Sequence, residues 1–459
     1  MSSITLEQRP KYKLVQSGEK IIFVVKDSDT VSNFKGKYIA TIYVHNRVSG
    51  IQSQTPIIAK IIPNDTGVGI LDLSPILDSF VSSENEGGIV HNQTSLTSAY
   101  NQTSFSQTTP HSIHQIDEFS TNRNTCRFIK IVFTCEFAIT QTDDVIERTT
   151  GSFTTDEFIV YNGYLEENDI LKLDANGNFG YNLDEAGFIM NDNESKFLTD
   201  SPTIQYIRDN DFMTFAFFSQ YDEDFVVGGA GTTNPSVRKM ERQFYYNGAT
   251  TGSVITDTIS TATGGHSGNM NDSNNKMQFF GVGTANLQGK GGSLPANWDY
   301  YTVKAFDDNN NQISQEYQIY GQTNDCKGFE TIRLTWLNKY GSWDYYNFTK
   351  KSTRKLSKKP TTFNQLGGTW NESTYRFTGH LGGKKVLYNN ITETITVNTD
   401  WITDEESLWL ESLFTSSEVY IINEKSTDSA AGYIRKYVEP VIISTKGFTR
   451  KTKVNNKTF

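Results

Sequence analysis

Short stretches in which apolar and polar residues alternate recur along the chain and predict a protein made of β-strands. The clearest stretch covers residues 128–140. Its apolar positions fall on one face and its polar positions on the other: Ile129, Ile131, Phe133, Cys135, Phe137 and Ile139 against Lys130, Thr134 and Glu136. Alternation over so many positions predicts a strand with one face in a core and the other in solvent. Shorter strand patterns at 20–26, 37–44 and 56–62 are separated by turn-forming pieces such as 64–67.

Two pairs of strand patterns in the second half of the chain predict β-hairpins. In the first pair, residues 300–306 and 315–320 flank a turn rich in Asp and Asn. In the second pair, residues 331–337 and 343–348 flank a loop that contains Gly341. Trp and Tyr side chains are frequent in the second hairpin and bury large areas, so we expect it to anchor its domain.

One segment near the C-terminus predicts a helix at about residues 404–415. Thr403 stands at the N-cap position, and Glu406 three residues later completes a capping box. An apolar stripe follows at Leu408, Trp409, Leu413 and Phe414. The fold class predicted from these patterns is mainly β, with several antiparallel β-sandwich or barrel-like domains, long polar loops and one short C-terminal helix.

Shifts in composition divide the chain into four predicted parts. They are an N-terminal β-sandwich domain at 1–165 with a polar loop at 90–115, an aromatic-rich β domain at 166–349 with a Gly/Ser/Asn-rich insertion at 258–293, a basic linker at 350–360, and a C-terminal α+β domain at 361–459 that ends in a basic tail. A long polar loop in a compact domain is usually a contact arm or disordered. No period of 20 to 50 residues repeats, which argues against a propeller or solenoid.

The basic linker holds six Lys or Arg residues: Lys350, Lys351, Arg354, Lys355, Lys358 and Lys359. In an acidic protein, such a segment can dock on an acidic partner or on a neighbouring copy of the chain. The alternative is a solvated linker without a partner. A second basic segment forms the tail, with Lys446, Arg450, Lys451, Lys453 and Lys457.

Composition and charge narrow the classes of fold and partner. The 459 residues include 29 Phe and 23 Tyr, which favours strands over an all-helical or doubly wound fold. The net charge of −10 and the pI of about 5.3 argue against a surface for duplex nucleic acid, which needs clustered Lys and Arg. No stretch approaches the roughly 18 to 20 apolar residues that span a membrane. The first residues lack the pattern of a secretory signal, so we expect a protein made and kept, at least initially, in a cytoplasm.

Motifs for catalysis or metal binding are weak in this sequence. The Gly-rich stretch at 281–291 departs from a phosphate-binding loop in spacing and lacks the final Ser or Thr, so it is interpreted as a flexible surface loop. The stretch at 265–269, around His266 and Ser267, lacks the last Gly and the preceding strand of a nucleophile elbow. Asp222, Glu223 and Asp224 could pair as glycosidase carboxylates, but a solvated turn is the simpler interpretation.

Residues that commonly bind metals do not form a recognisable site. His91, His111 and His114 lie in the polar loop, His45 lies at a strand end, and His380 precedes two glycines. Two histidines three apart lack a third ligand. The segments 174–178 and 307–312 resemble fragments of calcium loops but are better explained as tight turns. We therefore predict no catalytic residues, no metal site and no cofactor.

The three cysteines are predicted to be small buried residues. Cys126 and Cys135 lie nine apart on one predicted strand, about 30 Å from each other if the strand is extended, and they face opposite sides. Cys326 has no CxxC partner, so neither a disulfide framework nor a zinc site is indicated.

Three segments carry a resemblance to a protein class. They are residues 333–348 (RLTWLNKYGSWDYYNF), residues 408–421 (LWLESLFTSSEVYI) and residues 67–77 (GVGILDLSPIL). Together they resemble segments of virion structural proteins of tailed bacteriophages. The resemblance covers about half of the chain and carries no catalytic residues. It implies a tail, neck or baseplate component, located in a virion that assembles in the host cytoplasm.

The leading hypothesis is a non-enzymatic structural component of a phage tail, in the form of a ring, collar, hub or baseplate part. Its expected partners are copies of itself and other tail or neck virion proteins, because strand-rich domains with loops and charged segments can contact several neighbours in a ring. The alternative is a receptor-binding module for cell-surface glycan that uses exposed aromatic residues such as Trp298, Trp343 and Tyr346. A tail-borne depolymerase comes third, with Asp222 to Asp224 as its only candidate.

Overall fold

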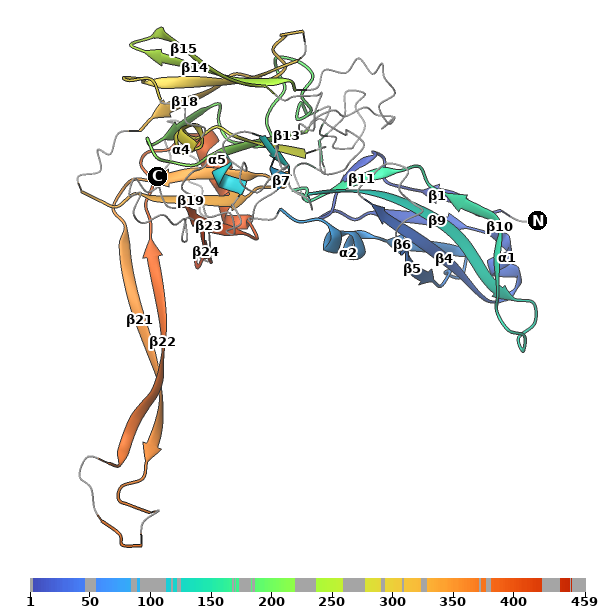
Figure 1. Cartoon of the computed structure of the whole chain (residues 1–459). Coiled ribbons are helices and arrows are strands. Elements are labelled where there is room, and N and C mark those ends of the chain that lie inside the picture. Colours follow the sequence, from blue (N-terminus) through green and yellow to red (C-terminus); the bar gives the residue numbers. More distant parts are fainter. Residues whose placement is uncertain are drawn as a thin grey trace.

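The protein is mainly β, with several separate sheets and few helices (Figure 1). The computed structural model describes residues 3–45, 55–83, 89–90, 113–116, 119–121, 125–166, 169, 171–172, 183, 186–218, 237–258, 277–289, 294–307, 309–322, 328–370, 373–376, 381–422, 438–445 and 447. Among the strands within these ranges, two pairs, β2 with β11 and β12 with β18, are parallel, and the other pairs are antiparallel. Within the described ranges, no helix is long and apolar enough to cross a membrane.

The N-terminal part is a β-sandwich, as its sequence predicts. One sheet has the order β1 (Thr5–Gln8), β3 (Ile22–Lys26) and β6 (Val68–Asp72). The other has the order β2 (Leu14–Gln16), β11 (Phe158–Tyr161), β9 (Cys126–Ala138), β4 (Phe34–His45) and β5 (Ile57–Ile61), and β10 (Ile146–Thr154) pairs with β9. Short helices α1 (Ser28–Ser32), α2 (Ser74–Leu77) and η2 (Asp78–Phe80) connect the strands. Side chains of both sheets share one core, which is why the sheets stack.

Strand β9 follows the predicted alternation with three differences, one of which is that Thr134, expected in solvent, is buried. Ile129, Ile131 and Phe133 lie in the sandwich core as expected. Ile139 lies beyond the end of the strand and is 65% exposed. Glu136, on the opposite face, is mostly buried because the lysines of β4 and β5 cover it, and its carboxylate accepts a hydrogen bond from Lys60. The opposite face is therefore partly covered by neighbouring side chains rather than open to solvent.

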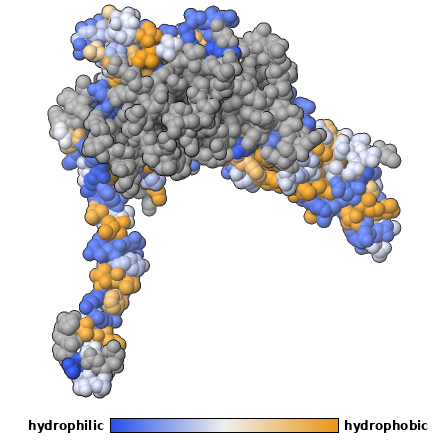
Figure 2. All heavy atoms as spheres, viewed as in Figure 1, coloured by the Kyte–Doolittle hydropathy of each residue, from blue (hydrophilic) through white to orange (hydrophobic). Residues whose placement is uncertain are grey.

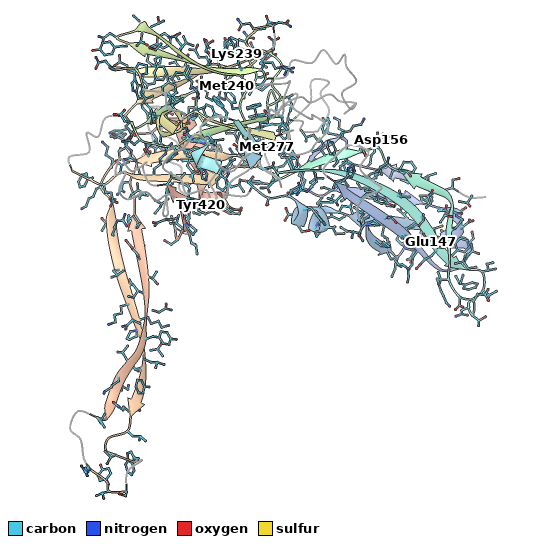
Figure 3. The ribbon with its side chains drawn as sticks, viewed as in Figure 1. Glu147, Asp156, Lys239, Met240, Met277 and Tyr420 are labelled. Carbon is cyan, nitrogen blue, oxygen red and sulfur yellow. The ribbon has the colours of Figure 1, made fainter. Side chains whose placement is uncertain are left out.

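Two sheets enclose the large central core. A five-stranded sheet has the order β12 (Ile204–Ile207), β18 (Tyr317–Gly321), β17 (Tyr300–Phe306), β14 (Lys239–Tyr246) and β15 (Ala249–Thr258). A four-stranded sheet has the order β13 (Thr214–Phe218), β16 (Met277–Gly281), β8 (Phe119–Thr121) and β7 (Ile89–Val90). Met240 of β14 and Met277 of β16 are fully buried in this core (Figure 3). Strands β17 and β18 form the first predicted hairpin.

Parts of the predicted polar loop at 90–115 belong to the central core. Ile113 and His114, in the short helix η4 (Ile113–Gln115), are fully buried, and so is Ile116. Strands β7 and β8 join the sheet of β16, far along the chain. The prediction failed here because a few apolar residues between long polar tracts give no periodic signal. Residues 91–112 lie outside the described part.

A second four-stranded sheet carries the predicted helix. Its order is β20 (Trp343–Phe348), β19 (Ile332–Leu337), β23 (Val419–Ile422) and β24 (Val438–Val441), and α5 (Asp404–Thr415) packs on it. Strands β19 and β20 are the second predicted hairpin. The sheet joins strands from both sides of the predicted boundary at 350–360, so residues 361–459 do not form a domain apart from 166–349. Strand pairing between segments 80 residues apart leaves no local sequence signal.

The capping box of α5 is present as predicted. The Thr403 hydroxyl accepts a hydrogen bond from the backbone N–H of Glu406 at 3.1 Å, and the Glu406 carboxylate accepts one from the N–H of Thr403 at 2.8 Å. The predicted apolar stripe is only partly right. Trp409 and Leu410 are buried, whereas Leu408 points outward and is 54% exposed.

The segment interpreted as a basic linker is instead a strand of a long hairpin. Strand β21 (Thr353–Gln365) pairs along its whole length with β22 (Gly383–Thr396) and with no other strand of the described chain. We call these two strands and the residues between them the arm. The arm projects from the central body, and the N-terminal sandwich extends from the body in another direction (Figure 1). The linker interpretation was wrong because both faces of the arm are exposed. Lysines therefore occupy both faces of β21, and the sequence lacks the alternation of apolar and polar residues that indicates a strand.

The turn between β19 and β20 connects the central body to the N-terminal sandwich. The backbone N–H of Tyr164 donates to the carbonyl of Lys339 at 2.9 Å. Gly341 has a φ of 72°, and a Cβ there would lie 1.8 Å from the carbonyl oxygen of Asn162. Only glycine allows this close approach. The Lys339 ammonium lies 3.0 Å from the Asp169 carboxylate, which adds an ion pair to the junction.

Candidate functional site

The part of the Gly-rich stretch whose burial the structure describes, residues 281–287, is buried rather than a flexible surface loop. It begins at the end of β16 and continues into the six-residue helix α4 (Thr284–Gly289). Val282, Ala285 and Asn286 are fully buried. A Cβ on Gly283 would lie 2.5 Å from the backbone nitrogen of Met213, so this glycine serves close packing. The predicted insertion at 258–293 accordingly contains core structure, and its residues 259–276 lie outside the described part.

The histidines within the described ranges do not form a metal site. His114 is fully buried, with Nδ1 2.6 Å from the Tyr345 hydroxyl and its ring edge-on to Trp343. Burial lowers the pKa of His114 to about 3, and the charge of Arg333 acts in the same direction. His45 is also buried, with Nε2 3.5 Å from the Glu157 carboxylate. No cluster of three metal-binding side chains occurs among the residues that the structure describes.

Several sequence candidates cannot be placed. His91, His111, His266 and His380, the carboxylates of 222–224, and the segment 174–178 lie outside the described residues, as do Cys326 and the basic tail from Arg450 onward. Lys446 is also outside them.

Two of the simpler interpretations are confirmed. The segment 307–312 contains a tight turn in which the Asp307 carboxylate accepts hydrogen bonds from the backbone and side-chain nitrogens of Asn311 at 2.7 and 2.9 Å. Cys126 and Cys135 are buried and free, and they belong to different cores, as expected for opposite faces of one strand.

The three aromatic candidates differ in exposure. Trp343 is buried and stacks edge-on with Tyr420, so it does not face solvent as the glycan hypothesis assumed. Trp298 is partly buried against Phe244 and Tyr301. Tyr346 lines a groove at the surface. The hypothesis treated Trp343 as exposed. Strand β20 belongs to a sheet that is covered on both faces, so most of its side chains are buried whichever face they occupy.

This groove is the main candidate site and has a volume of about 590 Å³. It forms where β12, β20 and the start of α5 meet. Aromatic residues from all three elements line it, namely Tyr206, Tyr345, Tyr346, Trp401 and Trp409. Tyr206 and Trp401 are 52% and 56% exposed, so their rings are accessible from solvent. A groove of this size with aromatic walls and a few polar groups is typical of a ligand-binding site.

A buried hydrogen-bond network holds the floor of the groove. The Asn347 side chain donates to the Asp211 carboxylate at 2.9 Å and to the side-chain carbonyl of Gln322 at 3.0 Å, and it accepts from Arg333 at 2.9 Å. Gln205, also in the floor, donates to Ser201 at 2.7 Å. These contacts fix the amide groups of the floor in one orientation.

The rim of the groove is acidic. Asp400, Glu405 and Glu406 line it, and Lys350 pairs with Asp400 at 2.7 Å. The hydrogen bond from Lys350 lowers the pKa of Asp400. Burial raises the pKa of the Tyr346 hydroxyl, and the carboxylates of Glu406 and Asp400 raise it further. Tyr346 therefore stays neutral at physiological pH and can donate a hydrogen bond.

Four tyrosines form a row across the exposed face of the five-stranded sheet and end at this groove. Tyr245, Tyr300 and Tyr320 occupy paired positions on β14, β17 and β18, and Tyr206 pairs with Tyr320 on the edge strand β12. The ring centroids are 4.7, 4.8 and 6.0 Å apart along the row. Neighbouring rings thus cover the faces of the two inner tyrosines, and Tyr206 at the end of the row borders the groove. Sequence reasoning missed this row because its members come from four separate strands.

Comparisons with known proteins identify no relative in sequence. No protein-family model and no curated protein matches the chain. Matched solved structures include trypsin-activated alpha-2-macroglobulin from Escherichia coli, with 6% identity and a TM-score of 0.19 over 88% of this chain and 23% of that chain. They also include a Salmonella alpha-2-macroglobulin mutant, with 6% identity and a TM-score of 0.17 over 78% of this chain and 22% of that chain. The chain spans less than a quarter of the length of these proteins, and scores this low carry no argument.

Proposed function

We propose that the chain is a non-enzymatic structural component of a bacteriophage tail that assembles with copies of itself and attaches neighbouring virion proteins. The tail assignment rests on the sequence resemblance of residues 67–77, 333–348 and 408–421. A ring, collar, hub or baseplate part is the expected form, located in the virion after assembly in the host cytoplasm. The observation that supports assembly is the arm.

The arm has the properties of an incomplete structure. An isolated two-stranded hairpin is at best marginally stable in water, and both strands here have an unpaired outer edge. Its apolar side chains are exposed, as the alternation of apolar and polar colour along it shows (Figure 2). They include Leu356, Phe363, Leu366, Val386, Leu387, Tyr388 and Ile391, which are 42% to 74% exposed. A partner that covers this surface would stabilise the arm through apolar burial and main-chain pairing.

Charge favours a second copy of the chain as that partner. Strands β21 and β22 hold six basic residues and one carboxylate, a net charge of +5. Because the whole chain carries −10, the rest of it carries −15. Lys355, Lys358 and Lys359 form no ion pair with any residue in the described ranges. The basic arm of one copy is thus complementary to the acidic body of another.

Charge reversal on the arm tests this proposal. We expect the wild-type protein to form a defined oligomer, and Lys358→Glu with Lys359→Glu to weaken its self-association at least about tenfold, because two attractive contacts become repulsive. Multi-angle light scattering and sedimentation over a range of concentrations measure this effect. High salt should weaken the wild-type oligomer in the same direction.

A matched control separates the arm from net charge. Lys20→Glu with Lys26→Glu changes the net charge equally on the exposed surface of the N-terminal sandwich and should leave the oligomer intact. A wild-type protein that stays monomeric at high concentration would refute assembly through the arm. Equal weakening by both double variants would show a general charge effect instead.

A further inference from the structure

We infer that the groove between β12, β20 and α5 binds a neutral oligosaccharide. This inference goes beyond the proposed assembly role and does not depend on it. It starts from the aromatic groups of the groove, which lie close together although they come from three elements. Tyr206, Tyr346 and Trp401 present large apolar surfaces beside polar groups in a volume of about 590 Å³. Sugar rings need this combination, because their C–H faces are apolar and their hydroxyls require hydrogen-bond partners.

The accessible rings are Tyr206 and Trp401. Tyr206 packs against Tyr320 on one side, and it borders the groove at the open end of the tyrosine row. Trp401 directly follows Asp400, whose carboxylate accepts a hydrogen bond from the Trp401 backbone N–H at 2.8 Å. Both side chains are more than half exposed. By contrast, the rings of Tyr345 and Trp409, which also line the groove, are buried. Exposed rings of this size are stabilised when an apolar surface stacks on them.

The polar groups of the groove fit sugar hydroxyls. Glu405 makes no hydrogen bond or ion pair with any described residue, so its carboxylate can accept from ligand hydroxyls. Gln322 uses its carbonyl for Asn347, which leaves its side-chain N–H groups to donate. The Tyr346 hydroxyl stays protonated at physiological pH. Hydrogen bonds from hydroxyls to a carboxylate are among the stronger ones.

The charge of the groove selects among glycans. Three carboxylates line it, namely Asp400, Glu405 and Glu406, and Lys350 pairs with Asp400 at 2.7 Å. A sialic acid or uronic acid carboxylate would therefore meet like charge at the rim. The network of Asn347, Asp211 and Arg333 fixes the floor before any ligand binds, which reduces the entropy lost on binding. A neutral glycan chain is the ligand that these features favour.

The test is a glycan array followed by calorimetry. The array holds neutral oligosaccharides of glucose, galactose and N-acetylglucosamine beside sialylated and uronate-containing glycans. We expect binding to neutral members, and the strongest of them is then titrated into the full-length protein. Trp401→Ala and Tyr206→Ala should each weaken the affinity about tenfold or more, because each removes a stacking surface.

Matched control variants are available outside both the groove and the arm. Phe34→Ala on β4 and Tyr246→Ala on β14 remove exposed rings, 49% and 44%, that do not line the groove and should change the affinity less than about twofold. Absence of binding to every neutral glycan, preference for acidic glycans, or equal losses from groove and control variants would overturn the inference. An effect of Trp401→Ala on oligomer mass without glycan binding would also overturn it and would assign the groove to contacts between copies. If the assembly proposal fails instead, the wild-type protein stays monomeric in light scattering, and glycan binding is unaffected.

Discussion

Replacing Arg333 with Met should lower the free energy of unfolding by about 3–5 kcal/mol, because it breaks a buried charged network. The Arg333 guanidinium is almost fully buried and lies 3.6 Å from the Asp211 carboxylate, which is fully buried. Its nitrogens also donate to the carbonyl of Phe212 at 3.0 and 3.2 Å and to the Asn347 side chain at 2.9 Å. Met fills much of the same volume but donates no hydrogen bond to the Phe212 carbonyl or the Asn347 side chain, and it removes a positive charge from beside Asp211.

The remaining ion pair of Asp211 does not compensate for this loss. Arg208 keeps its contact with Asp211 at 2.8 Å. Burial acts to raise the pKa of Asp211, but the charges of Arg333 and Arg208 outweigh it and hold that pKa below its usual value. Without Arg333, less positive charge offsets the effect of burial, so Asp211 should titrate at a higher pH. The variant should then lose less stability than the wild type as the pH falls through the acidic range.

Urea denaturation followed by circular dichroism measures the difference, and Arg354→Met is its matched control. Arg354 also pairs with two carboxylates, Glu330 at 2.8 Å and Glu393 at 3.0 Å, but at an exposed position on the arm. Exposed pairs of this kind contribute about 0–1 kcal/mol. Similar losses from Arg333→Met and Arg354→Met would contradict a special role for the buried network.

The sequence predicted local elements of this fold better than their assembly. The hairpins β17–β18 and β19–β20 and the capping box at Thr403 depend on residues close together in the chain, so alternation and spacing were sufficient. The pairing of β19 with β23 joins segments about 80 residues apart and leaves no local pattern. The buried ends of long polar tracts, such as Ile113, were missed for the same reason.

The arm and the groove show a second limit of sequence patterns. A strand pair exposed on both faces needs no apolar side, so the lysines of β21 indicated a linker although its backbone is extended and paired. The groove collects Tyr206, Tyr346 and Trp401 from separate elements, and only Tyr346 was among the sequence candidates. The high content of aromatic residues in the sequence suggests aromatic surfaces of this kind, but only the folded structure shows where the groove lies.

Replacing Asp344 with Asn should remove one part of the pH dependence of stability. Asp344 lies where α5, β20 and the central core meet, and its carboxylate accepts hydrogen bonds from Thr199 at 2.6 Å, Asn338 at 3.0 Å and Trp409 at 2.8 Å. Burial raises its pKa to about 6, although these hydrogen bonds act to lower it. The folded state therefore binds the proton of Asp344 more tightly than the unfolded state, whose pKa is close to 3.8.

The sign of the effect follows from this difference. The contribution of Asp344 to stability is fully present below the unfolded pKa and is lost as the pH rises through about 6. The amide side chain of the Asp344→Asn variant has no proton to lose. The free energy of unfolding of the wild type relative to this variant should thus fall by about 2 kcal/mol between about pH 4.5 and about pH 7.5. The loss of a hydrogen-bond acceptor in the variant adds a difference that does not depend on pH and so does not affect this change.

Urea denaturation of both proteins at several pH values measures this relative change. Asp72→Asn is the control with the opposite sign, because hydrogen bonds from Ser74 lower the pKa of Asp72. The stability of the wild type relative to that variant should rise with pH, since the charged form of Asp72 is the one that the folded state stabilises. A relative stability of Asp344→Asn that is constant with pH would mean that Asp344 stays ionised throughout. In that case the three hydrogen bonds, rather than burial, would determine its charge, and the bond from Trp409 would hold α5 against the sheet equally at every pH tested.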